Sequence, residues 1–132
     1  MSTFLFLEKF KKSENQVHWW VTSADGDKLD IWVKQWRIPQ PWPRRILVHV
    51  CDASADMKYE TADADDPCSL ERGITALVRK STKRPPVNSI RFDPVGDSKK
   101  EIGSPYIPHA LLPNPSAEIL KVQIWWDWSA AA

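Results

Sequence analysis

The stretch VHWWVTSADGDKLDIWVK, Val17–Lys34, decides the fold class of this chain. Every second residue is apolar in two runs, one on each side of a break at residues 24–27. Such period-two alternation is typical of a strand that buries one face, and the glycine-containing break is typical of a tight turn. The stretch therefore predicts a β-hairpin. Its two apolar sets are Val17, Trp19 and Val21 and then Leu29, Ile31 and Val33.

The length of the hairpin loop determines which residues face each other across the two strands. A two-residue loop would pair Trp19 with Trp32 and put half of each apolar set on the wrong face. A three-residue loop over residues 24–26 pairs Trp19 with Ile31 and keeps both sets on one face. It also places Gly26 at the left-handed position that this type of loop requires. We therefore expect the three-residue loop.

This register has a consequence for the opposite face of the hairpin. That face carries polar side chains together with two indoles, which lie near His18. Since tryptophan is favoured at the centres of protein interfaces, the two indoles are candidate contact residues unless a second layer covers them. The residues of this face are Gln16, His18, Trp20 and Thr22 on the first strand and Lys28, Asp30, Trp32 and Lys34 on the second.

Four further segments have strand patterns. The last of them alternates, with Trp126 and Trp128 among aliphatic residues on one face and Trp125 on the polar face. We expect Trp126 and Trp128 to be buried, like Trp19, whereas Trp125 is a third candidate contact residue. The four segments are Thr3–Phe10, Ile46–Cys51, Val87–Val95 and Ala117–Trp128.

One segment has a helical pattern. Leu70, Ile74, Leu77 and Val78 recur at helical spacing after Asp66-Pro67, which is a favourable helix start. The sequence therefore predicts an amphipathic helix over about residues 67–81, ended by the prolines that follow.

The fold class expected from these elements is α+β and mostly β, with an antiparallel meander-type sheet and the 67–81 helix packed on it. The chain length of 132 residues fits a single globular domain, residues 1–129, with a frayed tail at 130–132. Two segments read as loops. They are the acidic segment Asp52–Asp66, with six carboxylates against one lysine, and the proline-punctuated residues 93–115.

Composition excludes several functional classes. The formal net charge is +1, so no overall field attracts nucleic acid or an anionic membrane. Only 4 glycines occur, and no glycine-rich phosphate-binding motif is present. No apolar run approaches the ~18 residues of a membrane span, and no secretory signal is evident. Two cysteines, Cys51 and Cys68, fit a reducing cytoplasm.

The segment that follows the hairpin combines tryptophans with cations. Prolines at 39, 41 and 43 make it extended and exclude an internal strand. Aromatic rings beside cations suit a single-stranded nucleic acid, although they suit a polar protein interface equally. The side chains concerned are Lys34, Trp36, Arg37, Trp42, Arg44 and Arg45.

Catalytic patterns are weak. His49 and Cys51 share one face of a predicted strand, which allows a thiol nucleophile with a histidine base, but a buried strand cysteine is usually a small apolar residue. The histidines and cysteines lack the paired spacing of a zinc site. No cofactor and no metal are expected.

The sequence thus predicts a non-enzymatic protein-interaction module, such as an adaptor, an accessory subunit or an inhibitor. A nucleic-acid-binding module that uses the tryptophans and arginines of residues 34–45 is the alternative, and a thiol hydrolase based on Cys51 and His49 is the third hypothesis. The expected partner is another protein, with nucleic acid as the alternative and no membrane. The predicted contact residues are Trp20, Trp32, Lys34, Trp36, Arg37, Trp42, Arg44, Arg45 and Trp125.

Overall fold

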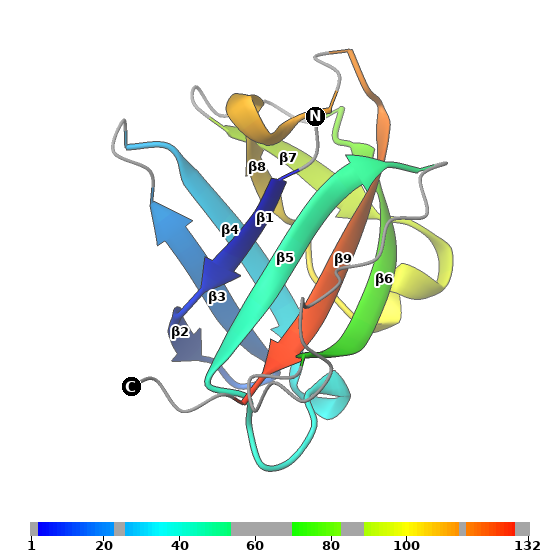
Figure 1. Cartoon of the computed structure of the whole chain (residues 1–132). Coiled ribbons are helices and arrows are strands. Elements are labelled where there is room, and N and C mark those ends of the chain that lie inside the picture. Colours follow the sequence, from blue (N-terminus) through cyan, green and yellow to red (C-terminus); the bar gives the residue numbers. More distant parts are fainter. Residues whose placement is uncertain (1–2, 23–25, 54–69, 83–88, 114–115, 129–132) are drawn as a thin grey trace.

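Nine strands and three short 3₁₀ helices make up the part of the chain that the computed structural model describes, residues 3–22, 26–53, 70–82, 89–113 and 116–128 (Figure 1). The strands are β1 (Thr3–Leu7), β2 (Lys9–Lys12), β3 (Gln16–Thr22), β4 (Lys28–Lys34), β5 (Arg45–Asp52), β6 (Leu70–Lys80), β7 (Ser89–Pro94), β8 (Tyr106–Pro108) and β9 (Ile119–Asp127). The 3₁₀ helices are η1 (Gln35–Arg37), η2 (Gly96–Lys100) and η3 (His109–Leu111).

The predicted hairpin is present as β3 and β4, in the predicted register. Trp19 lies opposite Ile31, and Val21 lies opposite Leu29. Gly26 has a φ of 88°, in the left-handed region that glycine adopts without steric cost. The register that a three-residue loop requires is therefore confirmed.

The strands form one antiparallel sheet in the order β1-β5-β9-β6-β7-β8-β4-β3-β2. Consecutive strands pair in two groups, β2-β3-β4 and β6-β7-β8. Elsewhere the order departs from the sequence, because β4 pairs with β8 and β9 lies between β5 and β6. The predicted α+β class with a meander-type sheet and a packed helix is wrong, because the described residues form a mostly β, curled antiparallel sheet with only short 3₁₀ helices.

The N-terminal segment connects the two ends of this sheet. β1 pairs with β5 and β2 pairs with β3, although only Glu8 separates β1 from β2 in the chain. The sheet is therefore curled, and β1 crosses from β5 towards β3 in Figure 1. Since unpaired edges invite association with other strands, one bent segment covers the longer strands β5 and β3 and leaves only the short edges of β1 and β2.

A common apolar core lies on the inner face of the curled sheet. Trp19 and Trp126 are buried in it, with 0% and 2% of their surface exposed, as expected, whereas Trp128 is only partly buried. The predicted buried strand is also confirmed, because every residue from Ile46 to Cys51 is buried. β5 is therefore buried on both faces.

The helix predicted over residues 67–81 is wrong. Its described part is β6, and no helix of this length occurs among the described residues. The same residues also alternate with period two: Ile74, Ala76 and Val78 are buried, while Leu77 is 40% exposed. Burial between β9 and β7 thus outweighs the helical spacing, because an extended segment completes two rows of backbone hydrogen bonds. The predicted helix start, Asp66-Pro67, lies outside the described residues.

Other predicted boundaries need smaller corrections. Residues 93–115, read as a loop, contain the end of β7, both η2 and η3, and β8. The single strand predicted over Thr3–Phe10 is divided at Glu8. The acidic segment beyond Ala53 and the tail at 130–132 lie outside the described residues. No helix among the described residues is long and apolar enough to cross a bilayer.

Gly73 is required where β6 and β9 meet. A β-carbon at this position would overlap the indole ring of Trp126. The register of β6 against β9 also shifts here, between Arg72 and Ile74. The absence of a side chain at Gly73 therefore lets the Trp126 indole lie directly on the β6 backbone.

We predict that Gly73→Ala lowers the free energy of unfolding by about 1–3 kcal/mol, because the methyl group overpacks the site against Trp126. Urea denaturation measures this change. Arg79→Gln, at an exposed position of the same strand, is the matched control and should change stability by less than about 0.5 kcal/mol. Equal effects of the two substitutions would contradict the assigned packing.

Candidate functional site

Four aromatic side chains form a row across the outer face of β3, β4 and β8, which we call the aromatic row: Trp20, His18, Trp32 and Tyr106. The His18 and Trp32 rings are stacked, with centroids 4.3 Å apart and an interplanar angle of 6°. Trp20 lies 4.9 Å from His18, and Tyr106 approaches Trp32 edge-on at 5.8 Å. All four side chains are half-buried. The prediction that Trp20 and Trp32 face away from the core is therefore confirmed.

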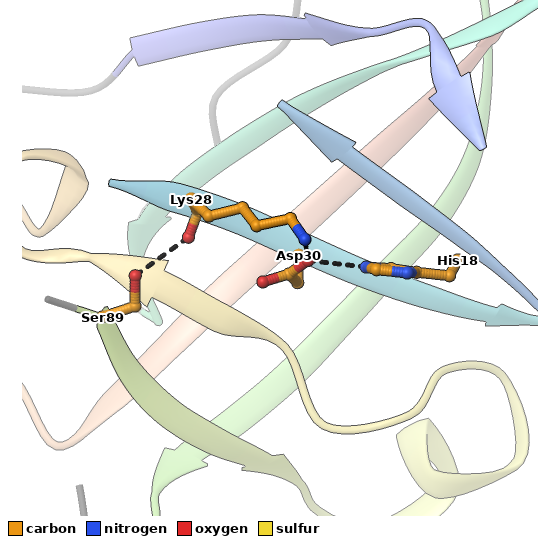
Figure 2. A network of polar contacts seen from close by, with 4 residues as sticks. All are labelled: His18, Lys28, Asp30 and Ser89. Carbon is orange, nitrogen blue, oxygen red and sulfur yellow. Dashed lines mark hydrogen bonds and ion pairs between the residues drawn. The ribbon is translucent and has the colours of Figure 1, made fainter. Parts of the chain in front are cut away.

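A polar network fixes one end of the aromatic row, and Figure 2 shows it from close by. His18 Nε2 lies 2.6 Å from Asp30 Oδ1, and Lys28 Nζ lies 3.6 Å from the same oxygen. Lys28 Nζ also lies 5.4 Å from the ring centroid of Trp20. Ser89 Oγ donates a hydrogen bond to the backbone carbonyl of Lys28 at 2.9 Å, which connects β7 to this network. Asp30 Oδ1 thus has one hydrogen-bond partner, His18, and one ion-pair partner, Lys28, within the chain itself.

A recess of about 270 Å³ opens at the other end of the aromatic row, where β4 separates from the segment before β8. Gly103 permits this arrangement, because a β-carbon there would meet Gln16 Oε1 at 2.8 Å and Trp32 Cβ at 3.1 Å. The residues that line the recess are Gln16, Trp32, Arg91, Gly103, Ser104 and Tyr106.

Asp93 holds two of these lining residues in place. Arg91 Nε donates to Asp93 Oδ1 at 2.9 Å, and Ser104 Oγ donates to the same oxygen at 2.8 Å. Burial opposes ionisation of Asp93, but the hydrogen bonds from Ser104 and Arg91 outweigh it, so the pKa of Asp93 is below its ordinary value. The same ion pair raises the pKa of Arg91. The Asp93 carboxylate therefore holds Arg91 and Ser104, two residues of the recess wall.

Trp36 is the most exposed large apolar side chain among the described residues, with 69% of its surface accessible. It lies on η1, two positions beyond Lys34 at the end of β4. Its indole Nε1 donates a hydrogen bond to the Lys100 carbonyl at 2.8 Å. The ring is therefore held in one orientation while most of it faces solvent.

Two of the three arginines predicted as contact residues are engaged within the chain. Arg37 Nε lies 2.6 Å from Glu101 Oε2, and Arg37 also donates to the Gly73 carbonyl. Arg45 donates to the buried carboxylate of Asp127, and this hydrogen bond raises the pKa of Arg45. Arg44 is exposed, and its backbone amide donates to the Asp127 carbonyl. These contacts attach the segment of residues 34–45 to β6 and β9.

The remaining predicted contact residues differ in exposure. Trp42 is half-buried, with Lys12 Nζ 5.2 Å from its ring centroid and Phe10 edge-on at 6.3 Å. Trp125 is buried, with 4% of its surface exposed, so the expectation that it belongs to an accessible surface is wrong for this conformation. Its face of β9 is buried at Gln123, Trp125 and Asp127, which period-two alternation alone does not reveal.

Trp125 belongs to a second buried group, on the outer faces of β5 and β9. His49 and Gln123 are fully buried there, and His49 Nδ1 lies 3.1 Å from Gln123 Oε1. Cys51 is a buried thiol whose Sγ lies 3.8 Å from the Lys121 carbonyl. His49 and Cys51 do share a face, as predicted, but the closest contacts described for them are with β9.

Sequence reasoning missed Tyr106 and Arg91 as site residues. Tyr106 falls in a segment punctuated by Pro105 and Pro108, which reads as a loop. Arg91 was placed on a strand, but its neighbours across the sheet depend on the pairing of β7 with β8. The alternation of Arg91 and Asp93 with buried Ile90 and Phe92 was the available signal for an outward-facing ion pair.

No protein-family model matches this chain, and no curated protein matches it either. Within the described part of the chain, no group of three or more potential metal ligands comes together. The candidate site is therefore defined by its geometry alone. It is a half-buried aromatic surface, held by contacts within the chain, with a recess at one end and the exposed indole of Trp36 nearby in sequence.

We predict that Asp93→Asn weakens the fold at neutral pH but not in acid. Because the pKa of Asp93 is lowered by folding, its stabilisation is complete above about pH 4, the ordinary value, and is lost as the pH falls through the lower value of the folded state. Asp93 is 38% exposed, so the loss at pH 7 should be at most about 1 kcal/mol.

Urea denaturation at pH 7 and at about pH 2–3 measures this difference, which spans the titration of an aspartate. Asp97→Asn, at a fully exposed carboxylate, is the control and should have no effect at either pH. A destabilisation by Asp93→Asn that persists unchanged in acid would refute the ionic role.

Proposed function

We propose that this chain is a non-enzymatic protein-interaction module, acting as an adaptor, an accessory subunit or an inhibitor. The observation that carries the proposal is the exposed indole of Trp36, held by its hydrogen bond to Lys100. A tryptophan that is rigid before binding loses little side-chain entropy on contact, and buried tryptophans dominate many interface energies. Trp36 is therefore the proposed central anchor.

The aromatic row supports the same proposal. The outward positions of β4 run from Lys28 through Trp32 to Lys34 and lead directly to Trp36. The ring of Trp32 is stacked by His18 on one face, so its edge and its remaining surface are what a partner can reach. Such a prepared aromatic surface with a polar rim has the composition of a protein interface.

A nucleic-acid-binding module is the alternative. It requires arginines that can neutralise phosphates and ring faces that can stack on bases. Arg37 and Arg45 are instead occupied by Glu101 and Asp127, and a lysine lies over the ring of Trp42. These contacts favour a protein partner over a single-stranded nucleic acid.

A thiol hydrolase remains the third reading. It requires a thiol that substrate can reach and a base within hydrogen-bond distance. Cys51 is 2% exposed and His49 is fully buried. This burial favours a packing role for both residues. We infer a cytoplasmic location from the buried thiol of Cys51, which suits a reducing compartment.

We predict that Trp36→Ala abolishes capture of the partner while leaving the fold intact. The exposed ring contributes little to stability, so the free energy of unfolding should change by less than about 0.5 kcal/mol. Loss of an interface anchor should weaken binding by at least about tenfold. Affinity capture from the native host, quantified by mass spectrometry against the wild-type chain, measures the effect.

Leu77→Ala is the matched control, because Leu77 is also an exposed apolar residue, 40% accessible, but lies on β6. We expect the partner to be captured by the wild-type chain and by Leu77→Ala and to be lost with Trp36→Ala. A partner retained equally by Trp36→Ala and the wild-type chain would reject the proposed anchor. Capture that is lost when nuclease is added would favour the nucleic-acid-binding alternative.

A further inference from the structure

We propose that the partner presents an acidic segment with one bulky apolar side chain, which enters the recess beside Trp32 while its carboxylates pair with Lys34 and Lys11 on the same face. This inference rests on the proposed function and specifies the chemistry of the partner. It combines the charge of the outer face with the size and lining of the recess.

The outer face of β2, β3, β4, β7 and β8 carries more positively charged than negatively charged side chains. Residues directly opposite each other in paired strands share a face, so Lys11 lies beside His18, and Lys34 lies beside Gln16. Lys28 and Arg91 lie on the same face, which thus carries four described cations. Its carboxylates include those of Asp30 and Asp93, whereas Glu101, opposite Lys34, pairs with Arg37.

Both carboxylates are already satisfied from within the chain. Asp30 lies close to His18 and Lys28, and Asp93 accepts hydrogen bonds from Arg91 and Ser104. Lys11 and Lys34 have no such compensation on this face. A partner that brings carboxylates to them gains attraction and faster association, whereas a basic partner is repelled.

The recess is a shallow hollow of about 270 Å³ that is open to solvent. Trp32 and Tyr106 provide two aromatic walls, which suit an apolar or aromatic group. Arg91 lines one side, and Lys34 lies beside Gln16 on the other. A bulky residue flanked by carboxylates therefore matches both the walls and the rim.

The same geometry disfavours nucleic acid at this surface. A base requires an open ring face on which to stack. Trp32 is stacked by His18 and Trp20 has Lys28 above its ring, so each indole has one face already in contact. Lys34 lies beside Gln16 at the rim of the recess and forms no ion pair with a described carboxylate, so an acidic protein segment is the better match.

NMR titration of the whole chain with short end-blocked peptides tests this inference. The probe is EDFDE, and its matched controls are EDSDE, which lacks the apolar side chain, and KKFKK, which reverses the charges. A thymidine oligonucleotide is the fourth ligand. We expect EDFDE to bind more tightly than all three and to shift the resonances of Trp32, Gly103 and Ser104.

Two variants locate the binding. Lys34→Glu should weaken EDFDE binding about tenfold, because it replaces attraction with repulsion at the rim. Gly103→Ala narrows the recess between Gln16 and Trp32, so it should reduce EDFDE binding to the level of EDSDE. Lys80→Glu, at an exposed lysine of β6, is the control and should change affinity by less than about twofold.

Failure of this inference is distinguishable from failure of the proposed function. If EDFDE binds no better than KKFKK or the oligonucleotide, or if Lys34→Glu has no effect, the acidic partner is rejected even when Trp36 is still required for capture. If EDFDE binds as predicted but capture does not depend on Trp36, the acidic recess stands and the anchor is wrong.

Discussion

The constraint on which the structure depends is the two-residue period of the β3–β4 hairpin. Once Trp19 lies opposite Ile31, every second side chain of both strands must enter the core, and every other one must face outward. A shift by one residue would bury Lys28 and Asp30 and expose Leu29. The burial of the core side chains and the outward position of the aromatic row therefore both follow from this register.

The outer face is ordered before any partner arrives. Stacking of His18 on Trp32, the carboxylate of Asp30 and the hydrogen bond of Trp36 to Lys100 each remove side-chain freedom in the unbound chain. Side chains that are already ordered cost little entropy when a second molecule covers them. This order distinguishes the surface from a set of merely exposed tryptophans, whose rotamers would have to be fixed during binding.

Local alternation predicted the hairpin, its register and the outward positions of Trp20 and Trp32, because the face to which a strand residue points depends only on its position along the strand. It failed for β6, where Leu70, Ile74, Leu77 and Val78 fit a helical spacing although burial follows period two. It also failed for Trp125 and Tyr106. The burial of Trp125 and the partners of Tyr106 depend on strands distant in sequence, and this information is absent from any local pattern.

The N-terminal segment pairs with two strands, because its β1 lies on β5 and its β2 lies on β3. Removal of this segment would uncover β3 and β5 together, leaving one molecule with two unsatisfied backbone edges. A molecule with two different free strand edges can add further copies head to tail. If the copies do not close into a ring, they form an open filament. Proteolytic trimming of this segment would thus replace the short edge strands β1 and β2, of 5 and 4 residues, with the longer edges of β5 and β3, of 8 and 7 residues.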